Sequence, residues 1–125
     1  MNVKIMGADQ SVKNKTGDNY VSTVQVSTKQ SRLYKVTFSP LAGMAADVYV
    51  WVFNTAAGSA SSANPDCVRY IPFGASDTWD LGEGGKLFTA GIYIALSTVP
   101  PTLATTTVTD SGINKLIISA DIRAG

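Results

Sequence analysis

A chain of 125 residues is long enough for one domain with its own core, because roughly two-thirds of the unfolded surface can be buried at this size. Apolar residues make up 45% and charged residues 15%, which excludes a disordered chain and favours a folded domain with a Ser-, Thr- and Asn-rich surface. The net charge of +1 gives no electrostatic argument for nucleic-acid binding, and eleven glycines and five prolines indicate many turns between short strands.

The N-terminal residues are weakly patterned. Val3 and Ile5 could form a short strand, and a polar stretch with two glycine turn points follows them. We therefore predict a polar, partly basic arm or hairpin over residues 1–18, followed by a β-sandwich domain over residues 19–125.

Residues 20–28 and 33–38 alternate between apolar and polar side chains with a period of two. This period is typical of antiparallel strands with one buried face. The side chains predicted to point inward are Val24, Val26, Tyr34, Val36 and Phe38. Pro40 is expected to end the second strand, and residues 41–46 are expected to form a loop.

The segment DVYVWVFNT, residues 47–55, is apolar on both faces when it is read as a strand. Such a strand must be central in a sheet, with both sides covered. One face carries Val48, Val50 and Val52, and the other carries Tyr49, Trp51 and Phe53. The residues expected to meet the valine face are Ile92, Ile94, Leu96, Leu116, Ile118 and Ile122. Those expected to meet the aromatic face are Tyr34, Phe38, Trp79 and Phe88, or neighbours in a second copy.

The aromatic residues Tyr49, Trp51 and Phe53 have two interpretations. They could fill the interior of a sandwich as core residues. They could instead form an oligomer interface or a ligand platform, which would be a large apolar patch on a monomer.

The second half of the chain continues the strand pattern. Residues 56–66 are predicted to be an exposed loop, and residues 67–73 a strand that Pro72 places at a sheet edge. Residues 77–81 and 86–90 are predicted to pair as a hairpin around a glycine-rich turn. Residues 91–97 form a second strand that is apolar on both faces, and residues 113–123 a closing strand with one solvated face. The sequence thus predicts an all-β fold, an antiparallel β-sandwich or jelly roll of eight to ten short strands.

Catalytic chemistry finds little support in the composition. The chain has no histidine, which removes Ser-His-Asp and Cys-His catalysis, and its single cysteine cannot build a zinc site. GEGGK, residues 82–86, lacks the spacing of a phosphate-binding loop and is predicted to be a turn. Asp77, Asp80 and Glu83 lie near Trp79, as in a sugar site, but solvent-facing carboxylates beside a core tryptophan are the simpler interpretation. We expect no catalytic, cofactor-binding or metal-binding residues.

Positive charge is concentrated near the N-terminus. Residues 1–35 hold six basic and two acidic side chains, whereas residues 36–125 hold four basic and seven acidic ones. A basic segment on a mildly acidic body either docks on an acidic neighbour or forms a solvated hairpin. The candidate partner-contact residues are Lys4, Lys13, Lys15, Lys29 and Arg32.

Targeting signals are not expected. The first ten residues lack the apolar run of a signal peptide, so the Asn14-Lys15-Thr16 glycosylation sequence is expected to be fortuitous. The longest apolar run, residues 48–53, is far shorter than the roughly 20 residues of a membrane span. We expect synthesis in the cytoplasm and no membrane partner.

Three segments carry a resemblance to a protein class: VYVWVFNTAAG at residues 48–58, IPFGAS at 71–76, and FTAGIYIALSTVPPTLA at 88–104. They resemble small β-sandwich virion structural proteins of tailed bacteriophages. In those proteins an apolar, tryptophan-containing strand, a loop of small residues and a Gly-Ile-Tyr-Ile-Ala-Leu-Ser type block precede the last strand. The resemblance covers about residues 45–125 and brings no catalytic motif with it.

The resemblance implies a structural role in a virion. The first expectation is a capsid-decoration, head-stabilising protein that binds the outside of the capsid lattice through its basic N-terminal segment and the loops at residues 56–66 and 98–112. Its partners would be the major capsid protein or neighbouring virion proteins and further copies of itself, with no direct nucleic-acid contact. The alternative is a receptor- or glycan-binding module of a tail fibre or other tail component, with Tyr20, Tyr70 or Trp79 as exposed aromatic residues.

Overall fold

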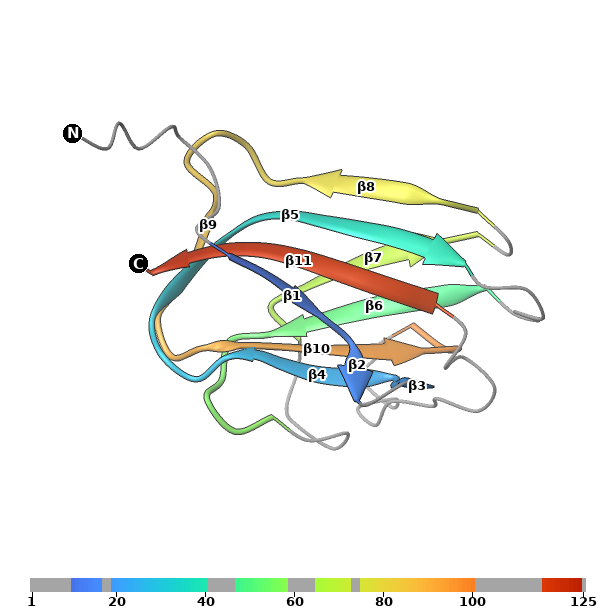
Figure 1. The fold of residues 1–125 in the computed structure, drawn as a ribbon, viewed down its shortest axis with the longest axis horizontal. Helices are drawn as coiled ribbons and strands as arrows, with labels where there is room; N and C mark the ends of the chain where they lie inside the picture. Colours follow the sequence, from blue (N-terminus) through green and yellow to red (C-terminus); the bar gives the residue numbers. More distant parts are fainter. Residues whose placement is uncertain are drawn as a thin grey trace.

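The computed structural model describes residues 10–16, 19–40, 47–58, 65–72, 75–100 and 116–124. Within these ranges the chain forms two antiparallel sheets, which lie as two layers in Figure 1. The first sheet contains β1 (Gln10–Lys13), β11 (Leu116–Ala124), β5 (Ser31–Pro40) and β8 (Asp77–Asp80) in that order, with β9 (Lys86–Phe88) also paired to β5. The second contains β4 (Thr23–Ser27), β10 (Ile92–Ser97), β6 (Val48–Phe53) and β7 (Cys67–Ile71). Between β1 and β4, β2 (Lys15–Thr16) and β3 (Asn19–Tyr20) pair with each other. The prediction of an all-β antiparallel sandwich is confirmed.

The strand pairings are nested along the chain. β1 pairs with β11, β4 with β10, β5 with β8 and β9, and β6 with β7. This is the order obtained when one long antiparallel hairpin is rolled up, so that its successive strand pairs lie alternately in the first and the second sheet. The described strands therefore have the connectivity of a jelly roll.

The main core lies between the sheets and includes the valine face of β6. Val48, Val50 and Val52 are fully buried there. The same cluster contains all six residues predicted to meet this face, namely Ile92, Ile94, Leu96, Leu116, Ile118 and Ile122. β6 and β10 are adjacent interior strands of the second sheet, which confirms that both are central. β7 is an edge strand, as Pro72 predicted.

Tyr34 is buried, as its predicted inward position requires, but it does not belong to this core cluster. Leu33 pairs with Ile122 and Lys35 pairs with Asp121, so Tyr34 is the extra residue of a β-bulge. The bulge shifts the alternation by one residue. Leu33, which is fully buried, therefore joins Val36 and Phe38 in the core.

The predicted hairpin between residues 77–81 and 86–90 does not form. β8 pairs with Lys35–Phe38 of β5, and β9 pairs with Ser31–Leu33 of the same strand. The turn between them is tight: Gly82 and Gly85 have φ of +93° and +66°, and Gly85 N–H donates to the Gly82 carbonyl at 3.1 Å. The turn thus bulges out and returns the chain to the same partner strand. β8 and β9 together act as one interrupted edge strand.

Candidate interaction surface

The outer faces of the two sheets differ in character. On the first sheet, the residues that alternate with the core positions are mostly polar: Ser11, Lys13, Arg32, Lys35, Thr37, Thr78, Asp80, Ser119, Asp121 and Arg123. On the second sheet they are mostly apolar: Tyr49, Trp51, Phe53, Val68, Tyr70, Tyr93 and Ala95. The outer face of the second sheet is therefore the candidate interaction surface.

One part of this face is covered by the chain itself. Trp51, Phe53, Tyr93 and Ala95 are buried and form a second apolar cluster, separate from the main core. The Phe53 ring centroid lies 6.2 Å from that of Trp51 and 5.8 Å from that of Tyr93. Trp51 Nε1–H donates to the Val99 carbonyl at 3.2 Å, so the segment after β10 closes over the indole.

This arrangement changes the expected covers of the aromatic face. Phe38 and Phe88 belong to the main core on the valine side, and Trp79 packs against that same core. The prediction that these residues meet the aromatic face is wrong. They point inward from the first sheet, and it is the valine face of β6 that looks toward that sheet.

Gln25 holds in place the segment after β6, which covers another part of the aromatic cluster. Its Oε1 accepts a hydrogen bond from Gly58 N–H at 3.0 Å, and its Nε2 donates to the carbonyls of Ser27, Thr55 and Ile92 at 2.8, 2.9 and 3.1 Å. Gly58 lies directly on the Tyr93 ring, where a Cβ atom would overlap the ring carbons. A glycine is needed at this position, since only its bare backbone can lie so close to the ring.

The other part of the face is exposed. Val68 and Tyr70 on β7 are 37% and 47% exposed, and Tyr49 on β6 is half-buried beside them. We call Tyr49, Val68 and Tyr70 the β7 strip. The Tyr49 and Tyr70 rings lie 5.1 Å apart between centroids, tilted by 42°. Tyr70 O–H donates to Asp47 Oδ2 at 2.9 Å, and this bond raises the pKa of the phenol above its usual value of 10.0. The Tyr70 hydroxyl is therefore protonated at neutral pH.

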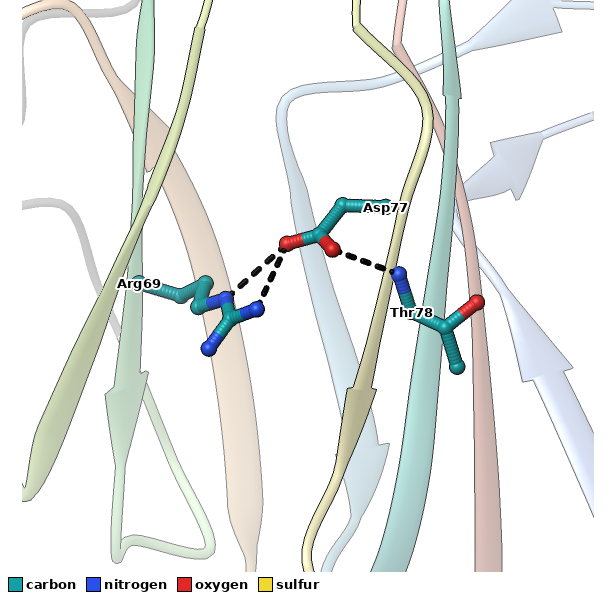
Figure 2. A network of polar contacts seen from close by, with 3 residues as sticks. All are labelled: Arg69, Asp77 and Thr78. Carbon is teal, nitrogen blue, oxygen red and sulfur yellow. Dashed lines mark hydrogen bonds and ion pairs between the residues drawn. The ribbon is translucent and has the colours of Figure 1, made fainter.

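Two ion pairs join the sheets along the edge that carries this strip. Arg69 Nε and Nη2, on β7, both lie 2.9 Å from Asp77 Oδ2, on β8 (Figure 2). Lys86 Nζ lies 3.1 Å from Asp66 Oδ2 and links the start of β9 to the start of β7. Both pairs are partly exposed, so each is expected to stabilise the fold by no more than about 1 kcal/mol. Their larger effect is to neutralise the charges beside β7.

Of the three acidic residues considered for sugar chemistry, Asp77 and Asp80 have structural partners, and Glu83 is exposed in the turn after β8. Asp77 is ion-paired with Arg69, and its Oδ1 also accepts from Thr78 N–H at 2.9 Å. Asp80 Oδ1 accepts from Gly82 N–H at 2.8 Å and holds the turn after β8. Trp79 lies beneath the Arg69 guanidinium, 5.9 Å from the ring centroid. In the described part of the chain, no three His, Cys, Asp or Glu residues are grouped so that they could hold a metal ion.

The structure does not gather the basic candidate residues into one patch. Lys13 is on β1 in the row of Ser119 and Thr37, whereas Arg32 lies five residues along β5 from Thr37, about 16 Å away. Lys15 follows Lys13, and Lys29 is in the turn before Arg32; both are exposed. Arg32 Nη1 donates to the Gly84 carbonyl at 3.3 Å. Lys4 lies outside the described residues.

Part of the predicted N-terminal arm is built into the sandwich. Residues 10–13 form β1, an edge strand paired with β11, and Asn14 is fully buried. Figure 1 shows β1 crossing the face of the molecule toward β2 and β3. Residues 1–9 lie outside the described ranges, as do 59–64 and 101–112 of the loops expected to contact a capsid. Among the residues described, no helix has the length and apolarity that a membrane span requires.

Cys67 is expected to be unreactive in the folded chain. Burial, followed by the nearby carboxylate of Asp66, raises the pKa of its thiol from 9.0 to about 11. Because the thiolate is the nucleophile, alkylation by iodoacetamide at pH 8 should be about 100-fold slower than in the urea-unfolded chain. A Thr78→Cys variant in a Cys67→Ser background supplies an exposed control thiol, which should react at the unfolded rate. Equal rates for folded and unfolded Cys67 would contradict this expectation.

Comparisons of the chain with protein-family models, with curated proteins and with solved structures give no match. The geometry of the described residues is therefore the basis for a functional proposal.

Proposed function

We propose that this chain is a non-enzymatic structural protein of a virion, a capsid-decoration protein that binds the outside of the capsid lattice. The observation that carries this proposal is the β7 strip, an exposed apolar surface on a module with jelly-roll connectivity. Exposed apolar residues beside a sheet edge are typical of a surface that contacts another chain, either a capsid subunit or a further copy of the same protein.

The resemblance to phage virion proteins supports the same proposal. Its segments contain β6, the end of β7 and β10, three strands of the second sheet, and with them the covered aromatic cluster. The proposed partners are the major capsid protein or neighbouring virion proteins, together with further copies of this chain. The proposed location is the virion, after synthesis in the host cytoplasm.

The test is the number of copies of this chain relative to the major capsid protein in purified particles, measured by quantitative mass spectrometry. Hundreds of copies per particle are expected for a decoration protein. A dozen or fewer would favour a tail or portal component, and absence from the particle would overturn the proposal.

The role of the basic residues can be tested on the same particles. Because residues 10–13 form β1, deleting residues 1–18 would remove a strand of the sandwich. Substitution is the cleaner test. Lys13→Ala with Lys15→Ala should weaken particle binding more than Lys29→Ala with Arg32→Ala if only the N-terminal pair faces the capsid.

A glycan-binding tail module is the second candidate, and one observation favours it. The Tyr49 and Tyr70 rings lie beside the Asp47 carboxylate, which combines apolar ring faces with a hydrogen-bond acceptor for sugar hydroxyls. Trp79 is unsuitable as an exposed platform because it packs against the core. Glycan-array binding that is lost in Tyr70→Ala, with an unchanged melting temperature, would favour this candidate over capsid decoration.

A further inference from the structure

The exposed large apolar side chains of the described residues all lie on one side of the sandwich. Val68 and Tyr70 are on β7, the edge of the second sheet, and Leu87 is on β9, at the edge of the first. Edge strands normally carry charged side chains that prevent pairing with another chain. β7 has only one charged side chain, Arg69, and presents an apolar outer face instead.

The hydrogen-bond pattern shows which backbone groups of β7 do not point toward β6. Leu96 N–H donates to the Ser22 carbonyl at 2.8 Å. The backbone N–H and C=O groups of the even-numbered residues of β10 therefore point toward β4, and those of Ala95 point toward β6. Ala95 pairs with Trp51, so the backbone groups of Trp51 point toward β10. Those of the even-numbered residues of β6 therefore point toward β7. Val50 pairs with Arg69, so Cys67, Arg69 and Ile71 bond to β6. The N–H and C=O groups of Val68 and Tyr70 therefore point away from the sheet.

Among the described residues, the same two residues thus supply both the backbone groups that point away from the sheet and the exposed apolar side chains. They are related by symmetry about Arg69. If two β7 strands align antiparallel with Arg69 opposite Arg69, Val68 of each copy lies opposite Tyr70 of the other. This pairing is self-complementary, as a two-fold contact between identical chains requires. A valine opposite an aromatic residue is also a favourable cross-strand pair.

Charge decides whether two such strands can approach. The two Arg69 side chains would be opposite each other on the inner face, where bare like charges repel. Each guanidinium is instead held by two 2.9 Å contacts to Asp77 Oδ2 of its own chain (Figure 2). The contact would therefore bring together two neutral ion pairs. Pro72, which follows β7 directly, has no N–H to donate and limits the pairing to the residues before it.

We propose that β7 pairs antiparallel with β7 of a second copy of this chain, so that the two β4-β10-β6-β7 sheets become continuous. This inference rests on the proposed function in one respect, because a protein that covers a lattice in many copies needs contacts between its copies. It identifies β7 as that contact and the Arg69–Asp77 pair as the condition for it.

The experiment measures the mass of the purified chain by size-exclusion chromatography with light scattering, across a concentration series. The wild type is expected at twice the chain mass of 13.1 kDa. Val68→Lys should be monomeric, because it places a charge on the apolar face of the contact. Thr23→Lys is the matched control at the opposite edge of the same sheet and should remain dimeric.

Asp77→Asn tests the charge condition. It leaves each Arg69 without its carboxylate, and the dissociation constant of the dimer should rise at least about tenfold. Each variant is compared with the wild type by circular dichroism and thermal melting. If Val68→Lys fails to fold, Tyr70→Lys serves in its place, since Tyr70 is the more exposed of the two. A monomeric wild type, or equal dissociation of Val68→Lys and Thr23→Lys, would overturn the inference.

Particle binding separates this inference from the proposed function. A chain that dimerises through β7 but is absent from particles would overturn the virion role alone. A chain that binds particles as a monomer, with binding lost in Tyr70→Lys, would overturn self-pairing alone and make β7 the contact for a different protein.

Discussion

Replacing Trp51 by alanine is expected to lower the free energy of unfolding by about 3–5 kcal/mol, the range for removing a fully buried tryptophan. Trp51 has no exposed surface although it lies on the outer face of its sheet. The substitution would leave a cavity beside Phe53 and would free the Val99 carbonyl from its indole donor. Urea unfolding followed by circular dichroism measures the loss.

Tyr49→Ala is the matched control for this prediction. Tyr49 points out from the same face of β6, two residues from Trp51, but is only half-buried. Its truncation should cost about 1 kcal/mol, since water already reaches the ring. If both substitutions cost the same small amount, the aromatic cluster would be open in the free chain. Trp51 would then belong to an interface rather than to the interior of the chain.

The sequence predicts the strands of this fold better than their partners. The alternation in residues 48–53 places the valines and the aromatic residues on opposite faces, and the structure confirms this division. Alternation cannot show which face looks toward the second sheet. The pattern therefore predicts the wrong side of β6 for Phe38 and Phe88. The turn glycines after β8 likewise show where the chain bends, but not that β9 returns to β5.

Local irregularities and isolated polar side chains limit the prediction further. The bulge at Tyr34 reverses the alternation without any glycine or proline to mark it. Gln25 and Asn14 look like surface residues of a strand and a turn, yet each makes several bonds to segments distant in the chain. Their roles depend on which strands meet, and a local pattern carries no information on that.

Asn14→Ala is expected to destabilise the chain by about 3 kcal/mol or more, because it leaves buried backbone groups without partners. Asn14 is fully buried where the chain leaves β1. Its Nδ2 donates to the carbonyls of Val21 and Leu116 at 2.8 Å each, and its Oδ1 accepts from Ile118 N–H at 2.7 Å. The side chain thus ties β11 of the first sheet to the segment that leads into β4 of the second.

Asn54→Ala is the control, because the Asn54 side chain also bonds groups of another segment, Thr89 Oγ1 and Ala90 N–H, but is exposed. Water can replace those bonds, so its loss should cost less than about 1 kcal/mol. Urea unfolding of both variants measures the difference, and equal costs would contradict the role assigned to Asn14.

Asn14→Asp separates hydrogen bonding from packing, since the side chain keeps its size but loses both donors to carbonyls. Burial beside two carbonyl oxygens should raise the pKa of the new carboxyl in the folded state. The folded variant then holds a proton that the unfolded chain releases above about pH 4. Relative to the wild type, its free energy of unfolding should be highest below that pH and should fall as the pH rises, whereas Asn14→Ala should follow the wild-type pH dependence. A pH dependence of Asn14→Asp identical to that of Asn14→Ala would mean that the carboxylate reaches water, and that Asn14 is not the closed polar link between the two sheets.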